Sequence, residues 1–203
     1  MDPMYVLASS SQRRISLLKK IRFNFIAVNH NIADEPKFED LKLKENISIE
    51  NFVKQLAFMK AKSIAANYKN SYIIGADTVI FFNGKAYGKP LNLEDAFNML
   101  KKFEGKTHEV YSGISIICPD NYVNKDIVLT DYDKTLVSVK PLSDNEINSY
   151  IYDHPPFDRA GSYGIQDENG VVESYSGSFE NVLGLPVQKL LQILKEHNLP
   201  LFF

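Results

Sequence analysis

The sequence predicts an α/β or α+β fold built around one mixed β-sheet. In the first half of the chain, short apolar strand-like runs alternate with helix-like segments, as in parallel strand–helix–strand units. Two long strand candidates, at 110–118 and 127–139, then follow each other with no helix between them, which favours antiparallel pairing. No glycine- or serine-rich linker divides the chain, so we expect a single domain over residues 1–203.

The N-terminal elements are predicted from hydrophobic spacing. Short apolar runs bounded by polar residues indicate strands, and apolar residues three or four positions apart indicate helices. The polar, charged segment around Pro36 has neither pattern and is expected to be an exposed loop. These rules predict a strand at 5–8, a helix containing Ile15 to Ile21, a strand at 23–28, the loop at 30–45, a helix of about five turns starting after Ser48, and a strand at 72–76 that ends at Asp77.

The later elements are predicted mainly from turn and capping residues. Asn83-Gly84 and Asn169-Gly170 have the composition of two-residue hairpin turns. Asn92 and Ser143 stand where helix N-caps are expected, the second in a capping-box pattern. We therefore expect a hairpin joining 79–82 to 85–87, a helix at 93–103, the strands at 110–118 and 127–139 with a polar turn at Asp120-Asn121, a helix from Ser143 to about Tyr152, a second hairpin joining 165–166 to 171–172, and a final helix at 187–196.

Composition limits the class of protein. The net charge of −2 does not provide the broad positive field that drives non-specific nucleic-acid binding. The single cysteine, Cys118, cannot form an intrachain disulfide and fits a reducing compartment. The start of the chain lacks signal-peptide character, and no apolar stretch approaches the roughly 20 residues that span a bilayer. We therefore expect a cytoplasmic protein without membrane contact or stable nucleic-acid binding.

The turn after the first strand has the features of an anion site. Three consecutive serines at 9–11 precede Arg13 and Arg14, where the first helix begins. Unpaired N–H groups and the positive end of the helix dipole favour an anion at such a position, and guanidinium groups match phosphate oxygens. A phosphate-bearing ligand is the first hypothesis. The alternative is an ordinary N-cap, at Ser10 or Ser11, followed by a solvated basic turn.

Charged residues elsewhere add further candidates. Asp77, at the predicted end of an apolar strand, could hold Mg²⁺, deprotonate a water, or simply initiate a turn. Lys60 lies in an alanine-rich helix and could reach into a pocket, although a lysine more commonly extends to the surface. Glu35 could be a second acidic ligand, although a carboxylate in a loop is usually only solvated, and Lys89 follows the hairpin. The block 158–166 combines glycines with polar groups that could hydrogen-bond a nucleobase, or that only shape a loop.

Other common catalytic groups are not supported by the sequence. The histidines show no metal-ligand spacing and no likely nucleophile beside them; they are His30, His108, His154 and His197. A serine or cysteine triad is likewise unsupported. The remaining set of basic groups, carboxylates and an amide suits metal-assisted phosphoryl transfer or hydrolysis of a nucleotide.

Several ordered motifs, taken together, closely resemble the Maf family of nucleotide pyrophosphatases, also known as septum-formation-inhibitor proteins. The motifs span nearly the whole chain and lie at 7–14, 56–61, 74–79, 88–90, 105–113, 160–166 and 181–186. The resemblance implies hydrolysis of a nucleoside triphosphate to the monophosphate and pyrophosphate, assisted by a divalent cation such as Mg²⁺ or Mn²⁺. It also implies an elongated central mixed sheet flanked by helices, two lobes around a nucleotide cleft, and often a homodimer.

The resemblance also assigns roles to residues. Asp77 is the expected general base and, with Glu35, a metal ligand. The expected triphosphate-binding residues are Ser9, Arg13, Arg14, Lys60 and Lys89. Arg13, Thr78 and Gln166 match the branch that acts on dTTP and UTP, whereas the 7-methyl-GTP branch differs at the threonine and the glutamine.

Two departures and two alternatives accompany this assignment. Gln12 replaces the proline that is usual before the double arginine, and Arg159 stands where a lysine is common. The first alternative is a nucleotide-binding regulator of cell division without turnover. The second is a house-cleaning enzyme for deaminated purine nucleotides such as ITP.

Overall fold

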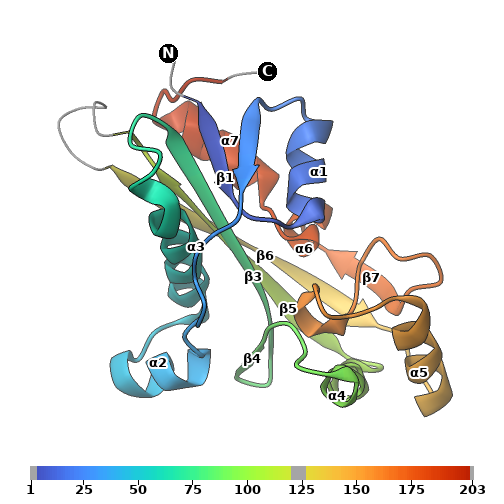
Figure 1. The fold of residues 1–203 in the computed structure, drawn as a ribbon. Helices are drawn as coiled ribbons and strands as arrows, with labels where there is room; N and C mark the ends of the chain where they lie inside the picture. The colour runs from blue at the N-terminus through green and yellow to red at the C-terminus, as the bar shows by residue number, and fades with distance from the viewer. Residues whose placement is uncertain (1–3, 120–126, 202–203) are drawn as a thin grey trace.

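The computed structural model describes residues 4–119 and 127–201, and a mixed seven-stranded sheet runs through it (Figure 1). Its strands are β1 (Tyr5–Ala8), β2 (Phe25–Val28), β3 (Tyr72–Phe82), β4 (Lys85–Tyr87), β5 (Thr107–Ile117), β6 (Val128–Val139) and β7 (Val172–Ser176). They lie in the order β2-β1-β3-β5-β6-β7, with β4 paired to β3. β1 is parallel to both of its neighbours and the other pairs are antiparallel, which confirms the predicted mixed sheet.

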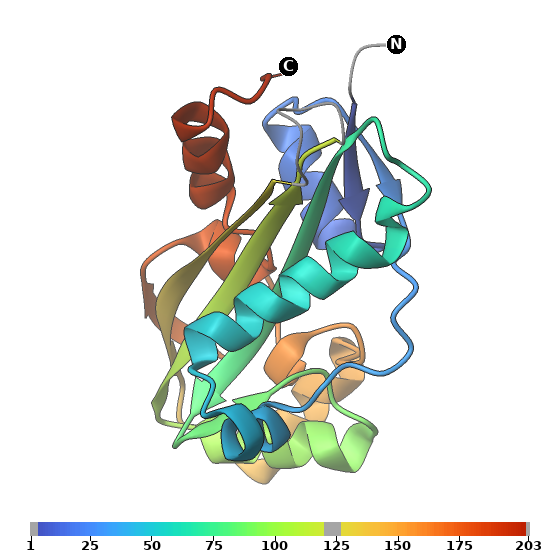
Figure 2. The same cartoon turned by 90° about the vertical axis from the view of Figure 1, so that its left-hand side faces the viewer.

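Helices cover both faces of this sheet. They are α1 (Gln12–Lys20), α2 (Phe38–Glu45), α3 (Ile49–Ala65), α4 (Leu93–Phe103), α5 (Asp144–Asp153), the short 3₁₀ helix η1 (Ala160–Ser162), α6 (Phe179–Leu183) and α7 (Val187–Glu196). α3 lies across one face, with α2 near its N-terminal end (Figure 2). The remaining helices pack on the opposite face. Among the described residues, no helix combines the length and apolar character needed to cross a bilayer.

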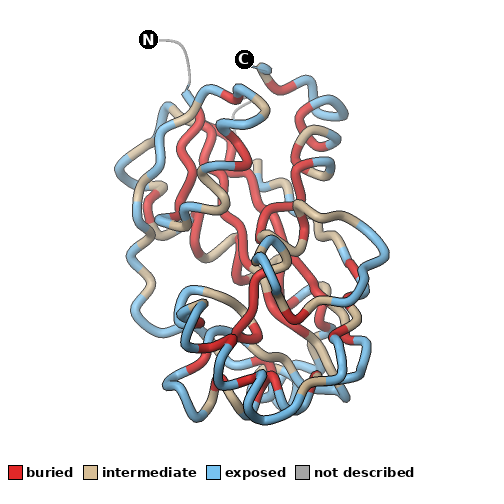
Figure 3. Tube along the Cα trace, turned by 90° about the vertical axis from the view of Figure 1, so that its right-hand side faces the viewer, coloured by how far each residue is buried: buried red, intermediate tan, exposed pale blue. Residues whose placement is uncertain are grey.

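The core on the face opposite α3 is divided into two clusters. Because side chains alternate along a strand, Ala76 and Ile80 of β3 both point to this face. Ala76 packs with apolar residues of α1 and α7, whereas Ile80 packs with those of α4 and α5. Figure 3 shows the buried residues concentrated along the strands and the inner sides of these helices. The two clusters give the two lobes that the resemblance implied, and Thr78 lies on β3 between them.

Two glycines allow α3 to lie directly against the sheet. A Cβ on Gly75 would lie 2.0 Å from the Ala57 carbonyl oxygen, and one on Gly113 would lie 2.2 Å from the Val53 carbonyl oxygen. Neither strand position can therefore carry a side chain while the helix stays where it is. This close approach determines how deeply Lys60 of α3 enters the site.

Most predicted elements are confirmed to within a few residues. The side chains of Asn92 and Ser143 accept the expected capping hydrogen bonds at the starts of α4 and α5. Ser48, after which a helix is expected to start, caps α3 in the same way. The predicted loop at 30–45 is wrong in its second half, which forms α2. Phe38 is the cause, since its ring is buried against the rings of Phe52 and Phe81.

Two other predictions are also wrong, and a third concerns residues that the structure does not describe. β3 does not end at Asp77 but continues to Phe82, because β5 pairs with it along nearly its whole length. The expected second hairpin does not form: residues 165–166 lie in a turn, and β7 pairs with β6 instead. The predicted turn at Asp120-Asn121 lies outside the described residues.

Candidate active site

The candidate site lies at a gap in the sheet beside β3. β1 pairs with β3 only as far as Leu7 and Ile74, and β4 pairs with it only from Ile80 onward. Between them, at residues 75–79, this edge of β3 has no partner among the described strands. A cleft of about 730 Å³ opens there. It is lined by every sequence-predicted site residue: Ser9, Arg13, Arg14, Glu35, Lys60, Asp77, Thr78, Lys89 and Gln166.

On the α3 side of the cleft, Lys60 bridges two carboxylates. Its ammonium group contacts Asp77 and lies 2.8 Å from Glu35 Oε1. Lys60 and Asp77 are buried, with 6% and 5% of their surface exposed, whereas Glu35 comes from an exposed loop before α2. Burial disfavours ionisation of Glu35, but the charge and hydrogen bond of Lys60 outweigh it and lower the pKa of Glu35. Glu35 is therefore negatively charged at neutral pH.

Two further residues shape the electrostatics of this side. Burial, followed by the positive charge of Lys60, lowers the pKa of His30 from its ordinary value, so its imidazole is neutral near pH 7. Lys89 is exposed in the loop after β4, and its charge also helps to lower the pKa of Glu35. The sequence did not predict His30 as part of the site, because the histidines have neither metal-ligand spacing nor a likely nucleophile beside them.

The two carboxylates are suited to a hard divalent cation. Asp77 and Glu35 approach one point from different elements, where the Lys60 ammonium lies between them. Carboxylate oxygens are the ligands that Mg²⁺ and Mn²⁺ prefer. In the part of the chain that the structure describes, no group of three or more His, Cys, Asp or Glu is placed to hold a metal ion. Asp77 and Glu35 are therefore the two carboxylates on this side of the cleft that could hold such a cation.

Arg14 connects the first turn to the other face of β3. Its Nε donates to the Gly184 carbonyl at 2.7 Å, and its two terminal nitrogens lie 3.4 Å from Ser9 Oγ and Thr78 Oγ1. Burial lowers the pKa of Arg14 from its ordinary value, yet a guanidinium remains protonated in proteins. The result is a fixed positive charge in the part of the cleft nearest the start of α1.

The serine side chains of this turn do not make the capping hydrogen bond that an ordinary N-cap at Ser10 or Ser11 would make. Ser11 occupies the N-cap position of α1 but makes no side-chain capping bond. Instead, the buried Ser9 hydroxyl accepts a hydrogen bond of 3.2 Å from the Ser11 N–H. Ser11 is therefore the N-cap by position, as the alternative stated, but its side chain does not cap α1. The serine side chain that binds backbone here is that of Ser9.

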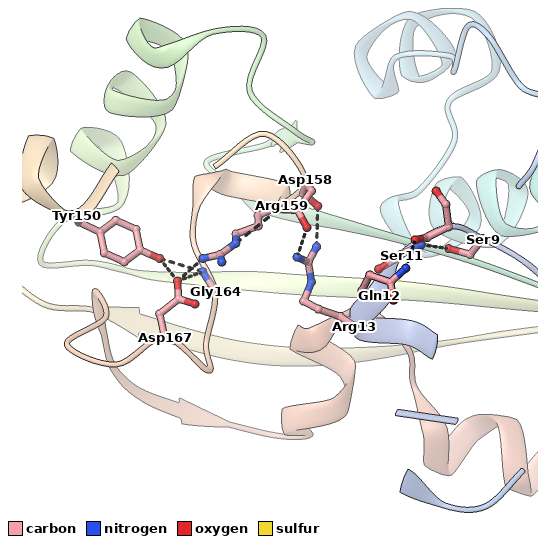
Figure 4. A network of polar contacts seen from close by, with 10 residues as sticks. Ser9, Ser11, Gln12, Arg13, Tyr150, Asp158, Arg159, Gly164 and Asp167 are labelled. Atoms are coloured by element: carbon pink, nitrogen blue, oxygen red, sulfur yellow. Dashed lines mark hydrogen bonds and ion pairs between the residues drawn. The ribbon is translucent and has the colours of Figure 1, made fainter. Parts of the chain in front are cut away.

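Arg13 reaches across the cleft to the opposite lobe. Its Nη1 and Nη2 donate to the carboxylate and the carbonyl of Asp158, each at 2.6 Å (Figure 4). The two residues are 145 positions apart in the chain, and no local pattern predicts their contact. Sequence analysis included Asp158 only as one member of a polar block. Arg13 is thus already paired before any ligand is considered.

A buried network supports the segment that carries Gln166. The Asp167 carboxylate accepts hydrogen bonds from Arg159, from the Tyr150 hydroxyl and, at 3.2 Å, from the Gly164 N–H (Figure 4). The adjacent Gln166 is exposed at the cleft. Arg159, which departs from the usual lysine, therefore has a structural partner in this chain.

Comparisons with known proteins extend over the same residues. The family model described as Maf-like protein matches residues 4–197. A dTTP/UTP pyrophosphatase of Thermosipho melanesiensis is 42% identical over 193 residues, which cover 93% of this chain and 95% of that protein. One of Clostridium perfringens is 41% identical over 196 residues, covering 96% and 97%. One of Caldicellulosiruptor saccharolyticus is 42% identical over 192 residues, covering 94% and 93%. The similarity includes both lobes and the whole cleft.

Proposed function

The chain belongs to the Maf family, and we propose on this basis that it hydrolyses dTTP and UTP to the nucleoside monophosphate and pyrophosphate. The three relatives described above, which align with this chain over nearly their whole length, are each named dTTP/UTP pyrophosphatase. The structural observation that carries the proposal is the convergence of Asp77, Glu35 and Lys60 with Arg14 in one cleft. The carboxylates of this set provide a base, and its cations balance the negative charge of the phosphates.

The phosphate groups bind along the positive side of the cleft. Arg14 and Lys89 lie on opposite lobes, and the N-terminal end of α1 adds unpaired N–H groups beside Ser9. A triphosphate repels an incoming nucleophile through its own negative charge. Fixed cations reduce this repulsion and stabilise the additional charge of the transition state.

Asp77 acts as the general base. Its carboxylate accepts a proton from a water molecule as the water oxygen bonds to the α-phosphorus. The bond between this phosphorus and the bridging oxygen breaks, and pyrophosphate leaves with the electron pair. Lys60 holds the Asp77 side chain in position, since its ammonium contacts the carboxylate within a buried site. Asp77 and Glu35 would hold Mg²⁺ or Mn²⁺, which when bound polarises phosphate oxygens as a Lewis acid.

The nucleobase is selected on the other face of β3. Arg13, Thr78 and Gln166 line this part of the cleft and match the branch of the family that acts on pyrimidine nucleotides. Homodimer formation, a cytoplasmic location and a single domain over the full length stay predictions of the sequence.

The proposal is tested by pyrophosphate release from UTP, dTTP, CTP, 7-methyl-GTP and ITP, each with Mg²⁺ or Mn²⁺. We expect the highest kcat/KM with UTP or dTTP. Highest activity with ITP would instead identify a house-cleaning enzyme for purines. Tight binding of a triphosphate without release of pyrophosphate would identify a regulator, and either result would contradict the proposal.

A further inference from the structure

A chain of three hydrogen-bonding groups crosses the sheet behind Thr78. Thr78 and Ser112 are directly opposite each other on β3 and β5, and their hydroxyl oxygens are 2.8 Å apart. Ser112 Oγ also lies 2.8 Å from the backbone carbonyl oxygen of Asn181 in α6. Ser112 is fully buried, whereas Thr78 is partly exposed to the cleft. At this point the cleft is lined by a hydroxyl whose hydrogen bonding continues through Ser112 and Asn181 into the protein.

The direction of these hydrogen bonds follows from the chemistry of the last group. A carbonyl can only accept, so the single hydroxyl proton of Ser112 is donated to Asn181. Ser112 then has only lone pairs left for Thr78, and the Thr78 hydroxyl must donate its own proton to Ser112. Thr78 Oγ1 consequently faces the cleft as an acceptor. Arg14 Nη2 donates to one lone pair of Thr78 Oγ1 at 3.4 Å, which agrees with this direction and leaves the second lone pair for a ligand.

The Asn181 carbonyl is itself firmly placed. The side-chain amide of Asn181 donates to the Val110 carbonyl at 3.1 Å and to Thr135 Oγ1 at 2.9 Å. Its backbone N–H donates to the Ser178 hydroxyl, which caps α6. These bonds attach α6 to β5 and β6. The Asn181 carbonyl accepts from the Gly184 N–H at 3.0 Å and, through its second lone pair, from Ser112. The acceptor at the end of the chain is therefore fixed by the fold and does not depend on a ligand.

We propose that Ser112 is a positioning residue for base selection, because it forces the Thr78 hydroxyl to accept a hydrogen bond from the ligand. An acceptor fixed in this way excludes a phosphate oxygen and selects an N–H or O–H group. This inference rests on the proposed function. Of the polar groups on the edge of both uracil and thymine, only N3–H is a donor, and it is the group assigned to Thr78. Cytosine has an unprotonated nitrogen at that position and is rejected.

The test compares kcat/KM for UTP and CTP in the wild type and in Ser112→Ala. Without Ser112 the Thr78 hydroxyl can rotate and donate, so the preference for UTP over CTP should fall on the order of tenfold, the value of one hydrogen bond. The change should come mainly from improved use of CTP. Comparing UTP with dUTP tests the other possible donor, the ribose 2′-hydroxyl. A loss of ribose preference with the base preference intact would overturn the assignment to N3–H.

Matched variants separate this effect from a loss of structure. Ser115→Ala is the control, since Ser115 is also fully buried on β5 but its hydroxyl has no hydrogen-bond partner among the described residues. It should leave the UTP/CTP ratio unchanged. Ser112→Cys keeps the packing with a weak donor and should give an intermediate ratio. Adding Ser112→Ala to Thr78→Val should change the ratio no further, because the group that Ser112 orients is gone.

The outcomes distinguish this inference from the proposed function. If the wild type releases no pyrophosphate from any nucleotide, the proposed function fails. If it is active and both Ser112 variants, with wild-type melting temperatures, keep the wild-type UTP/CTP ratio, this inference alone fails. Calorimetric dissociation constants for UMP and CMP give a second readout that does not depend on turnover. They should show the same loss of preference in Ser112→Ala.

Discussion

Asp77 and Thr78 are neighbours on one strand, but their side chains enter the cleft from opposite faces of the sheet. Asp77 lies on the face covered by α3 and contacts a charged partner, Lys60. Thr78 lies on the other face, where the neutral groups of Ser112 and Asn181 continue its hydrogen bonding into the core. In the proposed mechanism, the alternation of side chains along a strand thus separates bond cleavage from base selection by a single residue. A change on one face can leave the other face intact.

The largest effect is expected from Asp77→Asn. An amide cannot take the proton from water, so kcat should fall by at least about two orders of magnitude. The ratio of kcat/KM for UTP and CTP should stay at its wild-type value, because Thr78 and its partners are unchanged. Steady-state kinetics of pyrophosphate release provide both numbers. Near-normal kcat would show that Asp77 is not the base, and an altered ratio would show that the two faces are coupled.

The second largest effect is expected from a change in the packing of α3 against β3. In Gly75→Ala the new methyl group would lie 2.0 Å from the Ala57 carbonyl oxygen, so α3 must move away from β3. We expect the free energy of unfolding to drop by about 1–3 kcal/mol, with a loss of kcat as Lys60 shifts. Urea unfolding measures the first and kinetics the second. Gly88→Ala is the matched control, since a Cβ there meets nothing within 4 Å.

The Thr78 face should show a pH dependence of stability. Burial lowers the pKa of His108 from 6.5 to about 4, and its Nε2 lies 2.7 Å from the Tyr163 hydroxyl. Between these values the unfolded chain binds more protons than the folded one, so stability is complete above about pH 6.5 and decreases as the pH falls toward 4. Urea unfolding of His108→Gln across this range should give a smaller decrease. An unchanged slope would assign the effect to other groups.

The smallest effect is expected from Asp158→Asn, which frees Arg13 for the nucleotide. Asp158 is 69% exposed, and such surface ion pairs contribute little. We expect KM for UTP to fall by up to about fivefold, and the difference to shrink in high salt. Asp144→Asn removes a comparable exposed ion pair, with Lys101, far from the cleft and should leave KM unchanged. A rise in KM would mean that Asp158 holds Arg13 where the nucleotide needs it.

The sequence predicted what depends on local pattern and missed what depends on distant partners. The caps at Asn92 and Ser143 are signalled within one turn of helix, and both helices begin where expected. The helix starting at Phe38 was missed because the burial of this ring depends on Phe81, in a different part of the fold. The end of β3 was misplaced at Asp77 because a charged residue within a strand is tolerated only when a partner such as Lys60 is present.

The same limit applies to the site. Each predicted site residue lies in the cleft, and all of them except Glu35 belong to the motifs on which the family resemblance rests. The contact of Arg13 with Asp158 could not be predicted, since it joins the first turn of α1 to a loop 145 positions further along the chain. Ser112 lies within the motif at 105–113, but that motif gives no indication of the role proposed for it. Buried serines are common in proteins. Only the two contacts of this hydroxyl, with Thr78 and with the Asn181 carbonyl, determine the direction of its hydrogen bonds.

The continuous pairing of β3 with β5 has a mechanical consequence for the cleft. Both strands pass from one lobe to the other without a break, whereas β1 and β4 stop on either side of the gap. The lobes are therefore joined by a stiff, twisted ribbon and not by a hinge, and the width of the cleft is established when the protein folds. The free energy needed to hold the charged side chains of the cleft in place is then spent when the protein folds. The nucleotide therefore binds to a site that is already formed.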